Sequence, residues 1–436
     1  MDEAYTEAAS AEAYGVYVHG NTSINLTFTE DAIGNISADN ESGYAYAFGV
    51  YTERSQNTIT HSGSMEVIAI GSESGGYGIC VEDGNLSFTN SGDITVTAES
   101  EDYDVYAYGV YVNSGDGSGN IQSFDNSGTI TVTAESTSDD AYAYGIYADG
   151  DITGFNNSGT IEVTATSGNI SGAVYARGVW ADSITGFNNS GTIEASVENN
   201  TEETMYACAY SYGVVSSLDI TDLSNSGYIK ATAISLENIA RAYGVSSWWG
   251  DITMLNNSGE ISTDAEGVEE VESRGVYAYY WYYGETGAAS KGNITGLENS
   301  GTIEATAEQL GSVPGELQYP EYNILAVGVY SECYGEFITG AVSGGNIDGL
   351  ENTKTGEIIA EATGYNPVSI GISTWSFAWG NPETEVYVES SGGNITGLTN
   401  SGTISATAAA IAEDGEAYSS GIYTYSEASS SYGTAE

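Results

Sequence analysis

The residues with the clearest chemical potential are carboxylates, which gather in short clusters along the chain. Aspartate and glutamate number 61, against 7 lysines and arginines. Hard divalent cations bind clustered carboxylate oxygens. We therefore expect an acidic ridge that coordinates Ca²⁺ or another divalent cation, formed by Glu99, Glu101, Asp102, Asp104, Asp139, Asp140, Glu202 and Glu203. No calcium-loop motif fixes a site geometry, so a solvated acidic face is the competing interpretation.

Other chemistry-bearing groups are scarce. The chain has two histidines and three cysteines, too few for a Cys/His zinc site. We find no HExxH motif, no Ser/His/Asp grouping and no phosphate-binding glycine loop, and we expect no enzymatic activity. The formal charge of −54 excludes a nucleic-acid binder and a protein that docks on an anionic membrane, because both need basic residues facing phosphate.

Three recurring phrases place these residues on a repeating unit of about 32 residues. The phrases are N-S-G-T-I-x-A-T-A, A-Y-A-Y-G-[VI]-Y and I-x-G-[FL]-x-N. In one copy of the first, Ile161, Val163 and Ala165 alternate with Thr160, Glu162 and Thr164. A period of two indicates a half-buried strand. Each unit therefore reads as three short strands separated by Gly/Asn/Ser corners.

A three-strand unit cannot bury its own apolar face, so successive units must stack. The sequence predicts an all-β fold, a single-stranded parallel β-solenoid of about 11–12 coils and roughly 50–60 Å in length. The usual chirality of parallel crossovers favours a right-handed β-helix. We expect one repeat domain over residues 1–436, with regular coils in 1–305 and longer loop insertions in 306–436.

Equivalent residues of stacked coils form ladders. One asparagine of each unit is expected to hydrogen bond from coil to coil, and the glycine two residues later is expected to take a positive φ at the corner. His61 occupies the same register, which favours a rung of the ladder over a metal ligand. The asparagines are Asn90, Asn126, Asn157, Asn189, Asn225, Asn257, Asn299, Asn352 and Asn400.

Tyrosine is unusually frequent, with 35 residues. Alternation along the third strand predicts that the tyrosine before its glycine points outward and forms an aromatic face larger than a soluble monomer exposes. A surface for a neighbouring molecule, an internal stacking ladder and a carbohydrate platform are the three interpretations. The predicted assembly surface consists of Tyr77, Tyr108, Tyr144, Tyr212 and Tyr243.

The cysteines are Cys80, Cys208 and Cys333. Cys80 and Cys208 lie on third strands four coils apart, roughly 19 Å along the stack, which is too far for a disulfide. We expect no intramolecular framework, and the three residues are candidates for intermolecular disulfides or remain free thiols.

The repeat phrases resemble a known group of proteins. N-N-S-G-T-I (residues 156–161) and A-Y-G-I-Y-A (residues 143–148) are similar to the passenger repeats of bacterial autotransporters and related surface β-helix proteins, over roughly residues 30–305. This resemblance implies a right-handed β-helix at the cell surface or outside the cell. The acidic, tyrosine-rich composition is also similar to that of prokaryotic sheath and surface-layer proteins.

These features predict a structural, self-assembling extracellular protein, a subunit of a sheath, surface layer or filament whose partner is itself. The first and last third-strand copies, 13–18 and 417–425, would leave strand edges open for pairing. The alternative is an adhesin-type passenger domain that binds a host surface or a glycan.

Overall fold

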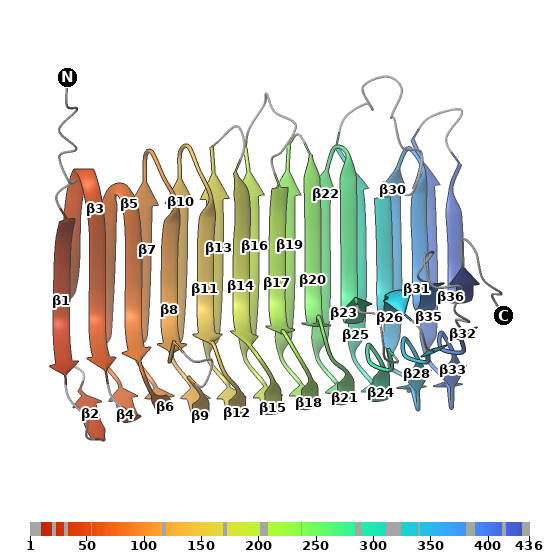
Figure 1. Cartoon of the computed structure of the whole chain (residues 1–436), viewed down its shortest axis with the longest axis horizontal. Coiled ribbons are helices and arrows are strands. Elements are labelled where there is room, and N and C mark those ends of the chain that lie inside the picture. The colour runs from red at the N-terminus through yellow and green to blue at the C-terminus, as the bar shows by residue number, and fades with distance from the viewer. Residues whose placement is uncertain are drawn as a thin grey trace.

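The computed structural model is built from strands stacked into a long row of coils, with the first and last described strands at opposite ends of the row (Figure 1). It describes residues 10–19, 23–29, 34–53, 55–115, 119–168, 172–200, 208–236, 238–283, 289–310, 324–338, 341–380, 389–411 and 416–429. These residues form no helix, and so none that could cross a membrane.

One coil consists of β12 (Ile152–Asn157), β13 (Thr160–Ser167) and β14 (Ala173–Ala181). Each pairs in parallel with its counterpart in the next coil, so that three rows of strands run along the molecule. The second and third rows lie face to face, and the short first row closes one side (Figure 1). The predicted parallel β-solenoid is confirmed; its handedness stays a prediction.

The strands fall into the three rows as follows. The first row continues with β2 (Ile24–Phe28), β4 (Gln56–His61), β6 (Asn85–Asn90), β9 (Ile121–Asn126), β15 (Ile184–Asn189), β18 (Ile220–Asn225), β21 (Ile252–Asn257), β24 (Ile294–Asn299), β28 (Ile347–Asp348), β29 (Glu351–Asn352), β33 (Ile395–Thr396) and β34 (Thr399–Asn400). The second row continues with β7 (Asp93–Ser100), β10 (Thr129–Ser136), β16 (Thr192–Asn199), β19 (Tyr228–Ser235), β22 (Glu260–Gly267), β25 (Thr302–Gln309), β30 (Glu357–Gly364) and β35 (Thr403–Ala410). The third row continues with β1 (Ser10–His19), β8 (Val105–Asn113), β11 (Ala141–Ala148), β17 (Cys208–Ser216), β20 (Ile239–Ser247), β23 (Glu270–Tyr283), β26 (Ile324–Ile338), β31 (Pro367–Gly380) and β36 (Tyr418–Ser429).

Two strands bend through the corner and serve both the second and third rows: β3 (Asn35–Glu53) and β5 (Ser64–Glu82). In the last third of the chain, part of the extra length is added to the third row, where β26 has 15 residues against 9 in β14. A small additional pair, β27 (Ala341–Val342) and β32 (Glu389–Ser390), lies beside these longer strands.

The core is a continuous column of inward-facing aliphatic residues. Ile161, Val163 and Ala165 have no exposed surface, as the alternation predicts. The third-row glycine belongs to this packing: a Cβ on Gly145 would lie 2.5 Å from Cγ2 of Ile161 and 2.5 Å from the carbonyl oxygen of Gly178. The isoleucine of one phrase therefore fills the space left by the glycine of the other, which explains why the two phrases recur together.

The corner glycines serve a different purpose from the one predicted. The glycine of N-S-G was expected at positive φ, and this prediction is wrong. A Cβ on Gly159 would collide with the carbonyl oxygen of Gly128, so glycine is needed because the backbones of successive coils approach closely. Positive φ occurs instead in the first row, at Gly154 (71°), and Asp222 (59°) and Met254 (56°) adopt it in coils that lack that glycine.

Candidate functional site

The inner asparagine ladder is a structural element of the core. Nδ2 of Asn157 donates to Oδ1 of Asn189 at 2.9 Å, and Nδ2 of Asn189 donates to Oδ1 of Asn225 at 2.8 Å. The same bond links every successive pair from Asn90 to Asn400. His61 begins the ladder with Nδ1 2.9 Å from Oδ1 of Asn90, and burial lowers its pKa. The predicted ladder is confirmed, with His61 as a rung.

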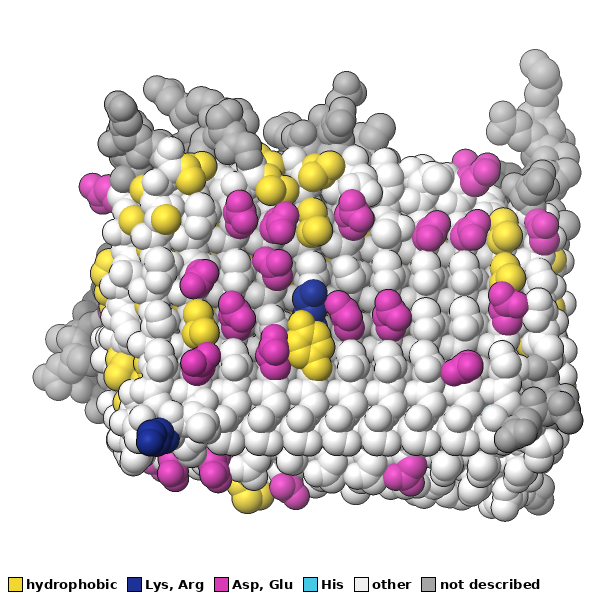
Figure 2. Space-filling model, turned by 180° about the vertical axis from the view of Figure 1, so that it is seen from behind, with side chains coloured by type: hydrophobic (Ala, Val, Ile, Leu, Met, Phe, Trp, Pro, Cys, Tyr) yellow, Lys and Arg dark blue, Asp and Glu magenta, His cyan; other side chains and the backbone are white. Residues whose placement is uncertain are grey.

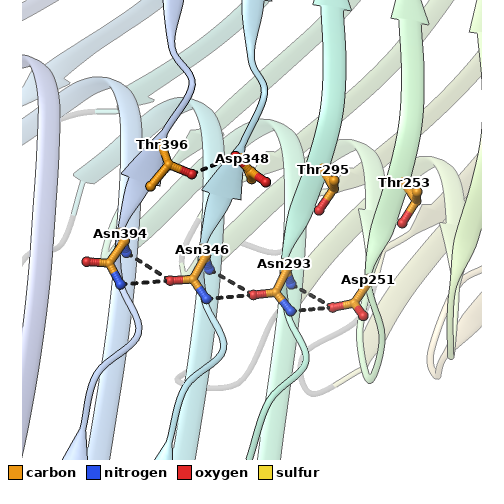
Figure 3. Close-up of a pocket in the computed structure, with 8 residues that line it drawn as sticks. All are labelled: Asp251, Thr253, Asn293, Thr295, Asn346, Asp348, Asn394 and Thr396. Atoms are coloured by element: carbon orange, nitrogen blue, oxygen red, sulfur yellow. Dashed lines mark hydrogen bonds between the residues drawn. The ribbon is translucent and has the colours of Figure 1, made fainter.

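A second, outer ladder lines a polar groove of about 380 Å³ on the first row (Figure 3). Both the backbone N–H and Nδ2 of Asn293 donate to Oδ1 of Asp251, at 2.8 and 2.9 Å. Asn346 and Asn394 repeat this double bond in the next two coils. Across the groove stands a column of hydroxyl and carboxylate groups, where Thr396 donates to Asp348 at 2.6 Å. Each asparagine amide of this ladder donates to the oxygen of the preceding residue in the ladder. The groups left to contact a ligand in the groove are therefore mainly acceptor oxygens and threonine hydroxyls.

The acidic clusters do not line up as one ridge. Glu99 and Glu135 occupy the same register position in successive coils, but the coil after them has Thr166 at that position. Figure 2 shows acidic side chains scattered among uncharged ones on the face drawn there. Asp104 and Asp140 accept hydrogen bonds from tyrosine hydroxyls at 3.0 and 2.7 Å, and burial raises the pKa of Asp104.

The other predicted ligands are more dispersed. Glu101 and Asp102 are exposed, Asp139 is half-buried, and Glu202 and Glu203 lie outside the described residues. Over the described part of the chain, no three His, Cys, Asp or Glu side chains come together in a group that could hold a metal ion. The ridge expected from the sequence is thus interrupted, and divalent-cation binding stays a prediction.

The predicted assembly tyrosines form a stacked column on the outside of the third row. Ala107 and Ala143 face the core, and Tyr108 and Tyr144 point outward with ring centroids 4.9 Å apart. Tyr77 stacks on Tyr108 at 5.1 Å and is half-buried. The orientation is as predicted, but the exposure is not: Tyr108, Tyr144, Tyr212 and Tyr243 are only 2–8% exposed. Their burial is a correction to the expected open aromatic face.

Flanking columns account for this burial. On one side Tyr106, Tyr142 and Tyr175 stack at 5.1 and 5.2 Å, and on the other Tyr111 stacks on Tyr147 at 5.1 Å. The third-row glycine drops out of the strand register, so the tyrosine one residue before it and the tyrosine two residues after it, such as Tyr144 and Tyr147, both lie on the outward face. Because the rings stack along the rod, they turn their faces to one another and their edges and hydroxyls to solvent.

Arginines replace tyrosines in three coils and add positive charge to this aromatic face. Arg177, Arg241 and Arg274 lie in strand register beside Tyr144, Tyr210 and Tyr243 of the preceding coils. The guanidinium of Arg177 lies between two rings of its column, with Cζ 5.2 Å from the ring centroid of Tyr144 and 5.3 Å from that of Tyr212. The column thus continues through cation–π contacts.

Beside these arginines lies a second groove of about 590 Å³, the aromatic groove. We define it by Tyr210, Arg241, Trp248, Glu270, Arg274 and Tyr279. The guanidinium carbon of Arg274 is 3.9 Å from the ring centroid of Tyr277. Burial opposes the charge of Arg274, but Glu272 and the surrounding rings hold its pKa above the ordinary value. No phrase in the sequence marks this groove, because its charges come from three different coils.

The cysteines are free thiols in the fold. Cys80 and Cys333 are 1% and 0% exposed, and burial raises the pKa of both. This burial argues against intermolecular disulfides at these two positions, because neither sulfur is exposed in the folded coil, and such pairing stays a prediction. Cys208, at the start of β17, is half-buried and is the one of the three with an exposed part.

Comparison with known proteins adds no identity: no family model, curated protein or solved structure matches the chain.

Proposed function

We propose that the protein is a structural subunit that assembles with copies of itself into an extracellular sheath, surface layer or filament. The observation that carries this proposal is the pair of open strand edges at the ends of the described rod. Among the described residues, β1 pairs only with β3, and β36 pairs only with β31. Unpaired backbone groups of this kind attract further strands.

The two open edges match each other in register. Tyr17 and Tyr423 belong to the same third-row column, and Val16 and Ile422 to the inward-facing column beside it. Pairing β36 of one copy with β1 of the next would place Ile422 on Val16 and Tyr423 on Tyr17. Tyr17 and Ile422 are 53% and 46% exposed, so such pairing would remove apolar surface from water.

The contacts between coils suit a structural protein. The asparagine ladder and the aromatic columns repeat one contact from coil to coil, and such repeated contacts stabilise a stack of parallel strands. The extracellular location in this proposal rests on the resemblance of the repeat phrases to surface proteins. A charge of −54 makes subunits repel, so assembly should strengthen as salt screens that repulsion.

The experiment places a charge in each open edge. The double variant Tyr17→Lys, Ile422→Lys should remain folded, because these side chains are 53% and 46% exposed, and should lose polymers in electron microscopy and sedimentation. Tyr103→Lys, at a residue 57% exposed on the side of the rod, is the matched control and should assemble normally. If the double variant assembles as the parent protein does, strand edges do not join the subunits.

A further inference from the structure

The aromatic groove gathers basic residues, which are rare in this chain. Three of the chain's 7 basic residues, Arg177, Arg241 and Arg274, lie in or beside it, on β14, β20 and β23. A volume of about 590 Å³ is within the range of small-molecule sites. The groove is separate from the end strands β1 and β36, on which the proposed self-assembly depends.

Its charges are balanced and already paired. Arg241 forms ion pairs with Glu270 and, at 3.4 Å, with Glu272. Arg274 forms ion pairs with Glu272 and, at 3.8 Å, with Glu332. Donors and acceptors therefore alternate along the groove with little net charge. Nε of Arg274 is buried without a hydrogen-bond partner, in a residue only 9% exposed.

One aromatic side chain breaks the axial stacking. Trp248 follows β20 and meets the ring of Tyr212 at 5.5 Å with an interplanar angle of 63°. It is half-buried, and in the described part of the chain no ring stacks on its face. The ladder tyrosines offer solvent only edges and hydroxyls, so Trp248 supplies the groove with a differently oriented aromatic surface.

We propose that the aromatic groove binds a neutral saccharide. Each sugar hydroxyl both donates and accepts, which matches neighbouring guanidinium and carboxylate groups such as those of Arg241 and Glu270. The C–H face of a sugar ring packs on an aromatic face such as that of Trp248. A charged ligand fits less well, because the groove is nearly neutral and a chain of charge −54 repels acidic sugars.

The test titrates the full chain with chitotriose, cellotriose, maltotriose and mannotriose, using saturation-transfer NMR and tryptophan fluorescence, and with 3′-sialyllactose as the acidic comparison. At least one neutral trisaccharide should bind saturably at millimolar concentration or below. Trp248→Ala should weaken that binding by about tenfold or more. Trp249→Ala is the matched control. The side chain of Trp249 is next to Trp248 in the sequence, is 46% exposed and does not line the groove, so this substitution should leave the affinity within about twofold.

Trp248→Phe keeps an aromatic ring and should retain most of the affinity, and this separates loss of the surface from loss of the fold. Circular dichroism and sedimentation of each variant should be unchanged, since the groove is remote from the open edges. The proposal is overturned if no neutral trisaccharide binds, if Trp248→Ala binds as well as the parent, or if 3′-sialyllactose binds more tightly than the neutral sugars.

Discussion

Removing one rung from the middle of the inner asparagine ladder tests what holds the coils together. Asn189 is 1% exposed, and its Oδ1 accepts from Asn157 at 2.9 Å. Its Nδ2 donates to Oδ1 of Asn225 at 2.8 Å and to the carbonyl oxygen of Tyr228 at 3.1 Å. Asn189→Ala leaves those two acceptors without this donor in a site that excludes water.

The expected cost follows from those contacts. A buried polar group left unsatisfied costs about 1–3 kcal/mol, so two of them give a loss of about 2–6 kcal/mol in the free energy of unfolding. With an unfolding entropy of about 2.1 cal/mol/K per residue, a chain of 436 residues that unfolds as one unit loses about 2–7 °C in Tm. Asn157 contributes little to the sum, because its amide also contacts the carbonyl oxygen of Thr192 at 3.1 Å.

The assay is urea denaturation followed by circular dichroism, together with calorimetry. Asn400→Ala is the matched control: this last rung is exposed, accepts from Asn352 at 2.8 Å, and should cost under about 1 kcal/mol. Equal losses for the two variants would refute the ladder as a source of stability.

Asn189→Asp adds a pH test of the same rung. The aspartate keeps the acceptor but loses the donor, and burial should raise its pKa in the fold above about 3.9. Its deficit against the parent should be small at low pH, where the protonated acid still donates. The deficit should grow as the pH rises through the raised pKa.

Three further predictions concern single positions. Gly145→Ala should destabilise the fold by more than about 3 kcal/mol, because its Cβ would overlap the next coil, whereas Gly421→Ala, with nothing within 4 Å, should be nearly neutral in the same denaturation assay. His61 has a lowered pKa in the fold, so the unfolded chain takes up its proton first and stability should fall as the pH drops below about 6.5. His61→Asn should abolish that part of the pH dependence in denaturation midpoints measured at several pH values. Cys208 should react with a thiol reagent in the native protein well before Cys333, which is fully buried, and equal rates by mass spectrometry would contradict the fold.

The sequence determined the features that depend on one repeated position. The alternation of Ile161 with Thr160 and Glu162 specifies a half-buried strand, and its recurrence specifies a stack of coils. An asparagine repeated at one position must meet its own copies in a parallel stack, so the ladder through Asn189 could be predicted without coordinates. The arginines in tyrosine positions were also visible, because register in a solenoid follows from the repeat itself.

Tertiary structure decided everything that depends on neighbouring columns. Tyr108 points outward as predicted, yet it is buried, because rings two residues before and three residues after it cover its sides. Glu332, 58 residues after Arg274 in the sequence, forms an ion pair with it at 3.8 Å. Neither composition nor repeat spacing predicts that these two side chains meet. Backbone approach between coils, which excludes a side chain at Gly159, is likewise a property of the stack. The repeat fixes what lies above and below each residue, whereas its lateral neighbours depend on how strands of different rows and lengths pack around the core.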